Sequence, residues 1–201
     1  MEEKIIKEDL EILDECPKYE PLTLLDKFFS EPEDTMEYNV AWQRKWLETF
    51  DCYAEKYADA VTYLYKASND ERFGYDQTAY PIIFLARHTI ELQLKSLIRI
   101  LSPQENVKTH NLDALWQKFD SLYLCDDKSN ETYQAAGKII KELSEYDNTS
   151  EALRYHIDTH NNPTAKMEFI DICQFYSTFI KLNNFLCGLS SLLQDCTNRI
   201  A

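Results

Sequence analysis

ARHTIELQLKSLIRIL, residues 86–101, has the apolar spacing of a helix that faces a protein core. On a helical wheel at about 100° per residue, Arg87 falls inside the apolar stripe, while Glu91 and Lys95 lie at its edge. Charged side chains rarely stand where a core is expected unless they are paired or take part in a site. The stripe itself is formed by Ile83, Ala86, Ile90, Leu94, Leu97, Ile98 and Leu101.

The spacing of these three charged residues supports two interpretations. They are four residues apart, so each side chain reaches the next along one helix face. In the first interpretation, Arg87 and Glu91 form a buried ion pair, and removing one partner costs about 3–5 kcal/mol because the other charge stays buried. In the second, Arg87 and Lys95 face a phosphate or another anion between helices, and Glu91 orients them. His88 would join the rim of that pocket.

The composition favours an all-α fold. The chain has 201 residues, 44% of them hydrophobic, but only 3 glycines and 6 prolines, which is too few turn residues for a protein of many strands. The net charge of −14 opposes non-specific binding to DNA or RNA, which needs Lys and Arg against the phosphates. It leaves room for a small local cationic pocket.

The chain is expected to contain an N-terminal arm, residues 1–37, that packs on a helical body, residues 38–201. Pro81 suits the first turn of a helix, because its missing N–H has no partner there in any case. Asn111 is a suitable N-cap, and Asp113 complements the positive end of the helix dipole. The expected helices are residues 37–68, a long helix from about Pro81 that ends before Ser102, a short helix after Asn111, residues 131–146 and a final long helix.

The final helix carries a strict three-four alternation of apolar residues, as in a helical bundle or a short coiled coil. The pattern alone does not decide between burial within one chain and burial between two copies. This apolar seam consists of Ile172, Phe175, Phe179, Leu182, Leu186, Leu189 and Leu193.

No stretch approaches the roughly 20 apolar residues of a membrane span, and the first ten residues, MEEKIIKEDL, are charged. The six cysteines are scattered and form no CxxC pair. We therefore expect a cytoplasmic protein without membrane association.

The histidines offer little support for a metal site. His156 and His160 are four residues apart with Asp158 between them, a spacing that suits a metal pair on a helix. The nearby Pro163 argues against a helix, and no third ligand is evident. We expect no metal and no cofactor.

Arg154 and His160 are the candidate catalytic pair. In RNA cleavage without a metal, a histidine takes the 2′-OH proton and an arginine stabilises the negatively charged phosphorus centre. The sequence contains no GxSxG, Walker, GxGxxG or HExxH motif, so a serine hydrolase, an NTPase and a dehydrogenase have no motif in their favour.

Three segments, taken in order, resemble the HEPN domain (higher eukaryotes and prokaryotes nucleotide-binding). FLARHTIELQLKSLI resembles that family's long helix, with Glu91 followed four residues later by Lys95. THNLDALW is similar to its His-Asp-Leu helix start, here His110, Asn111 and Leu112. EALRYHID resembles its Ala-Arg-Tyr-Pro-Asp segment, with His156 in the proline position and one residue inserted. The resemblance spans residues 42–193.

The resemblance implies an up-and-down bundle of four to five helices that is commonly dimeric. Members of the family act as metal-independent ribonucleases in toxin–antitoxin and antiviral systems, or as non-catalytic nucleotide-binding or RNA-binding modules. Arg154 aligns with the arginine of the Arg-Tyr-Pro type, whose members often lack the nuclease motif, and this favours ligand binding over catalysis.

We therefore expect a HEPN-like module that binds a nucleotide or RNA phosphate, forms a homodimer and has an antitoxin-like protein partner. The alternatives are a metal-independent endoribonuclease that uses Arg154 and His160, and a structural protein that dimerises through its last helix. The expected ligand-binding residues are Arg87, His88, Glu91, Lys95, His110, Arg154, Tyr155 and His156.

Overall fold

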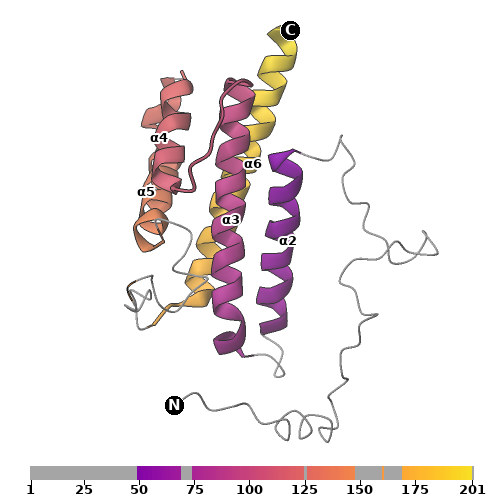
Figure 1. Cartoon of the computed structure of the whole chain (residues 1–201), viewed down its shortest axis with the longest axis vertical. Coiled ribbons are helices and arrows are strands. Elements are labelled where there is room, and N and C mark those ends of the chain that lie inside the picture. Colours follow the sequence, from indigo (N-terminus) through magenta and orange to yellow (C-terminus); the bar gives the residue numbers. More distant parts are fainter. Residues whose placement is uncertain (1–48, 69–73, 125, 148–159, 161–168, 201) are drawn as a thin grey trace, which may run out of the picture. The chain divides into compact units, whose positions relative to one another are not determined.

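The chain forms an all-α bundle, as the composition predicted (Figure 1). The computed structural model describes residues 49–68, 74–124, 126–147, 160 and 169–200. The chain separates into two units, Met1–Trp42 and Gln43–Ala201, and only the second contains described residues; the expected N-terminal arm lies outside them. The described part has no strand; its helices are α2 (Phe50–Ser68), α3 (Tyr75–Leu101), α4 (Leu112–Leu122), the short 3₁₀ helix η2 (Asp126–Ser129), α5 (Glu131–Tyr146) and α6 (Ile172–Ile200).

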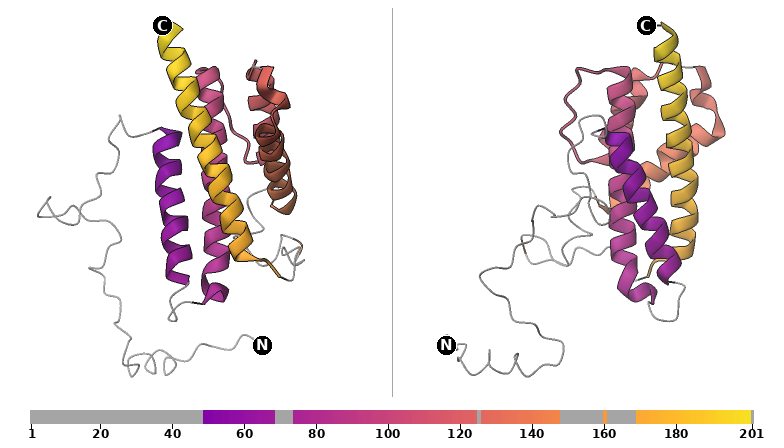
Figure 2. Two further views of the ribbon diagram at one scale, coloured as in Figure 1. Left: turned by 180° about the vertical axis from the view of Figure 1, so that it is seen from behind. Right: turned by 90° about the vertical axis from the view of Figure 1, so that its right-hand side faces the viewer.

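Helix α3 is the centre of the bundle and packs on α2, α4 and α6. Figures 1 and 2 show α2 on one side of α3, and α4 and α5 on the other. Every residue from Thr89 to Ile98 is buried, including the polar ones. A helix covered on all sides has to bury its polar positions too, so each needs a partner inside the protein.

Helix α3 begins at Tyr75, so Pro81 stands inside the helix and the predicted start was wrong. Pro81 has no N–H to donate to the carbonyl of Gln77, but both residues are exposed, so water can reach that carbonyl. The turns before Pro81 are held by a tertiary contact. The buried hydroxyl of Thr78 bonds the hydroxyl of Ser68 at the end of α2.

The apolar seam of α6 packs inside the chain. Its residues all belong to the core shared with α3, α4 and α5, most of them buried and Phe175 and Leu189 partly so. On α5, the ring of Tyr133 meets Phe185 of α6 edge-on, with centroids 6.4 Å apart. The seam is therefore occupied by the bundle itself.

Successive helices alternate in direction except for α3 and α4, which run the same way (Figure 1). The segment 102–111 returns along α3, because the carbonyl of His110 accepts a hydrogen bond from Arg87, in the middle of that helix. Asn111 then caps α4 as predicted, accepting from the Ala114 N–H at 2.7 Å. Helix α5 ends beside this point, since the Asp113 N–H donates to the Ser144 hydroxyl at 3.3 Å.

Candidate functional site

A cluster of charged side chains lies where the middle of α3, the start of α4 and the end of α5 meet. The return of segment 102–111 brings His110 to the level of Arg87, and the antiparallel course of α5 brings Asp147 there. Each element end supplies polar groups that a buried charge can use. We call this group, Arg87, Glu91, Lys95, His110 and Asp147, the polar cluster.

Arg87 ties the three elements together. Its side chain is 0% exposed. Nη1 lies 3.0 Å from Glu91 Oε2, and Nη2 donates to the His110 carbonyl at 2.6 Å. Nε donates to the Asp147 carbonyl at 3.2 Å and lies 3.3 Å from the Asp147 carboxylate, which adds an ion pair. A planar guanidinium carries five N–H donors in a fixed arrangement, so one side chain reaches all of these partners at once.

Glu91 is the acceptor that the other side chains share. Lys95 Nζ and His110 Nδ1 each lie 2.8 Å from its Oε1, while Arg87 takes the other oxygen. Burial by itself would raise the pKa of this carboxyl. The hydrogen bond and charge of Lys95, with the hydrogen bonds of His110 and Arg87, instead hold the Glu91 pKa below its usual value. Glu91 is therefore a carboxylate that only accepts hydrogen bonds.

The buried charges of the polar cluster compensate one another. Arg87 and Lys95 carry two positive charges, and Glu91 and Asp147 two negative ones. The ion-pair interpretation of the sequence is therefore confirmed for Arg87 and Glu91. Arg87 is fully buried, and its guanidinium contacts Glu91, His110 and Asp147 within the protein.

One edge of the polar cluster reaches the surface. The side chain of His110 is 62% exposed, whereas that of Lys95 is only 9% exposed. Lys108 and Thr109 precede His110 and are exposed as well. The hydroxyl oxygen of Thr109 accepts from the Asn111 N–H at 3.1 Å, so its proton points elsewhere.

His88 lies against α2 rather than among the hydrogen bonds of the polar cluster. Its ring meets Tyr57 edge-on, with centroids 4.7 Å apart, and is parallel to Phe84 at 6.3 Å. Burial in this aromatic setting lowers the pKa of His88, against the raising effect of the Glu91 charge. The structure therefore gives His88 a packing role between α2 and α3.

The third segment singled out in the sequence lies mostly outside the described residues. Arg154, Tyr155 and His156 are not among the described residues, so the Arg154–His160 pair stays a prediction. His160 is described and is exposed. Asp147 is a member of the polar cluster that sequence reasoning missed. It follows α5 as an ordinary C-cap, and nothing in its local sequence indicates that Arg87, sixty positions earlier, binds it.

No family model, curated protein or solved structure matches the chain. The HEPN resemblance thus rests on its three sequence segments. Within the described residues, no three His, Cys, Asp or Glu side chains gather as a metal site requires. None of the helices in that part of the chain combines the length and the apolar composition needed to cross a membrane.

Proposed function

We propose that the chain is a non-catalytic, HEPN-like module that binds the phosphate of a nucleotide or an RNA at the exposed edge of the polar cluster. One observation carries this proposal: the exposed imidazole of His110 is fixed by a buried carboxylate. Glu91 Oε1 lies 2.8 Å from Nδ1, which turns the other ring nitrogen, Nε2, away from Glu91. A ring fixed in this way binds a ligand without first losing its rotational freedom.

The chemistry of this edge suits a phosphate. As an imidazolium, His110 donates to Glu91 through Nδ1 and to a phosphate oxygen through Nε2. Lys108 and the hydroxyl of Thr109 lie on the same exposed segment, and α4 begins directly after it. The N-terminus of a helix favours a negative charge. These groups are the direct contacts that we propose.

The buried members of the polar cluster act as positioning residues. Arg87 holds the backbone of His110, and Glu91 holds its ring. Because the buried charges already balance, a phosphate gains little from Arg87 or Lys95 themselves. We therefore expect modest affinity, set mainly by the exposed donors.

The biological setting is a further part of the proposal. A bacterial defence or toxin–antitoxin system, a cytoplasmic homodimer and an antitoxin-like partner are supported by the HEPN resemblance alone. That resemblance also supports a non-catalytic module, because Arg154 matches the Arg-Tyr-Pro type of segment.

Calorimetric titration of the full chain with ATP, with AMP and with a short single-stranded RNA tests the proposal. His110→Ala removes a hydrogen bond to a charged ligand and should weaken binding by about 10–100-fold. Lys108→Ala should weaken it less. Lys138→Ala, at an exposed position on α5, makes the same charge change away from the site and should leave the affinity unchanged.

Two results would contradict the proposal. One is that the wild-type chain binds none of the three probes at millimolar concentration. The other is that the chain binds a probe with an affinity that His110→Ala and Lys108→Ala both leave unchanged, because the phosphate would then lie elsewhere.

A further inference from the structure

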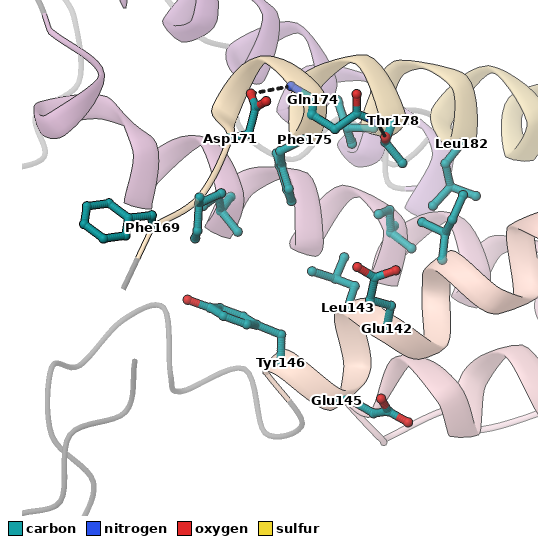
Figure 3. A pocket seen from close by; sticks show the side chains of 15 residues that line it. Glu142, Leu143, Glu145, Tyr146, Phe169, Asp171, Gln174, Phe175, Thr178 and Leu182 are labelled. Carbon is teal, nitrogen blue, oxygen red and sulfur yellow. Dashed lines mark hydrogen bonds between the residues drawn. The ribbon is translucent and has the colours of Figure 1, made fainter. Parts of the chain in front are cut away.

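A groove lies between the end of α5 and the start of α6, with α3 as its floor (Figure 3). Its volume is about 740 Å³, within the range of about 300–1,000 Å³ that is usual for binding pockets. Figure 3 shows Phe175 of α6 and Leu143 of α5 facing the same space. We call this space the α5–α6 groove.

The inner surface of the α5–α6 groove is apolar. Ile83 and Ile90 of α3 form the floor, and both side chains are buried. The half-buried Phe175 and Tyr146 form the walls. At the mouth, the ring of Phe169 is 86% exposed and extends the apolar lining to the surface.

Among the described residues, the charged side chains that line the α5–α6 groove are all acidic. Glu142, Glu145 and Asp171 line it, and no lysine or arginine does so among the described residues. Helix α5 also ends here, so the negative end of its dipole adds to these charges. Lys141 offsets them little, because it lies 3.9 Å from Glu145 and both side chains are mostly exposed.

This combination selects against several occupants. A phosphate or a fatty acid would place its negative group beside Glu142. A second copy of the chain carries a net charge of −14 and would meet the same repulsion. An apolar ligand that carries positive charges meets neither obstacle.

We propose that the α5–α6 groove docks an amphipathic helix of a basic protein partner. Apolar side chains at successive turns of that helix would enter the groove, as in other helix-in-groove complexes. The lysines or arginines that flank its apolar side chains would pair with the carboxylates of Glu142, Glu145 and Asp171. This surface is separate from the phosphate site proposed above, and its test does not depend on that site.

The test is the binding of a fluorescein-labelled amphipathic peptide of leucine and lysine to the full chain, measured by fluorescence anisotropy. A matched peptide with glutamate in place of lysine should bind at least about tenfold more weakly. Glu142→Lys should weaken binding of the lysine peptide by about 3–10-fold. Glu55→Lys, at an exposed position of α2, changes the net charge equally and should have a much smaller effect.

Thr178→Trp tests the groove itself, because it fills the space without altering a charge. Thr178 is half-buried and lines the groove on α6. The variant should abolish peptide binding while keeping the wild-type circular dichroism spectrum. Should it fail to fold, the comparison of Glu142→Lys with Glu55→Lys still decides.

Several outcomes would overturn the proposal. Equal weakening by the two charge reversals would mean that the peptide responds only to the overall acidity. Undiminished binding to folded Thr178→Trp would place the peptide outside the groove. If Thr178→Trp instead converted a dimer of the wild-type chain into a monomer, the occupant would be a second copy.

Discussion

Replacing Arg87 by methionine removes the guanidinium that holds the polar cluster together. Methionine keeps a long unbranched stem but has no donor. The change removes the Arg87 cation from the buried carboxylates of Glu91 and Asp147, of which Glu91 keeps its ion pair with Lys95, and it leaves the carbonyl of His110 without its donor. Breaking a buried ion pair by removing one partner costs about 3–5 kcal/mol.

The contacts support the same magnitude. An unsatisfied buried acceptor costs about 1–3 kcal/mol, and Arg87 serves two backbone carbonyls besides the carboxylates. These terms are not additive, because water can enter beside the exposed His110, so about 4 kcal/mol is a reasonable value. Against a typical stability of about 5–15 kcal/mol, this is a large fraction.

Urea unfolding of the full chain, followed by circular dichroism, measures the effect. For a slope of about 2 kcal/mol per molar urea, the midpoint should fall by about 2 M. Arg99→Met is the matched control on the same helix: Arg99 is exposed over the Phe50 ring, 5.6 Å from its centroid, so the loss should stay below about 1 kcal/mol. If Arg87→Met costs no more than this control, the polar cluster is not the tie that we describe.

The remaining predictions concern packing, pH and catalysis. Gly137→Ala should destabilise the chain by about 1–3 kcal/mol although alanine is the better helix former, because the new Cβ would lie 2.7 Å from Trp116 Nε1. Gly188→Ala has nothing within 4 Å of the new Cβ, so it should stabilise the chain by about 0.5–1 kcal/mol. Urea unfolding of both variants checks the two signs. Burial lowers the pKa of His88 in the folded chain from 6.5, so on acidification the His88 imidazole is protonated in the unfolded chain before it is protonated in the folded chain. The free energy of unfolding should therefore fall as the pH drops below 6.5 towards the lower folded pKa. His88→Phe should show a smaller fall in the same titration. RNA incubated with the chain in EDTA should stay intact on a gel, whereas cleavage that disappears in His160→Ala would favour the ribonuclease alternative.

Local sequence signals predicted several helix boundaries correctly, because the interactions that set those boundaries join residues close together in the chain. Asn111 caps α4 through a bond that spans three residues, and α5 covers residues 131–146 as expected. The start of α3 was missed for the opposite reason. The penalty for Pro81 within the helix is offset by the packing of α3 on α2 and by the contact between Thr78 and Ser68, neither of which a local pattern contains.

Arg87 and Glu91 could be identified from the sequence because a helical wheel places Arg87 inside the apolar stripe and Glu91 at its edge. His110 could be assigned to the site only through the family resemblance, and Asp147 could be assigned neither from the helical wheel nor from the resemblance. The contacts of His110 and Asp147 with Arg87 depend on where segment 102–111 and α5 bring the chain back to α3. Contacts of this kind join positions far apart in the sequence, so they carry no periodicity that could reveal them.

The sequence by itself determined that this is an all-α protein, and that α3 carries Arg87 within a stripe that had to be buried, with Glu91 at the edge of that stripe. The small number of glycines and prolines is enough for the first conclusion, and helical periodicity for the second. Only the tertiary structure decided that the apolar seam of α6 is used within the chain, that His110 is the exposed end of the polar cluster, and that a groove with an acidic rim remains beside α5. These depend on how the helices are placed against one another, because burial is a property of neighbouring elements and not of any one helix.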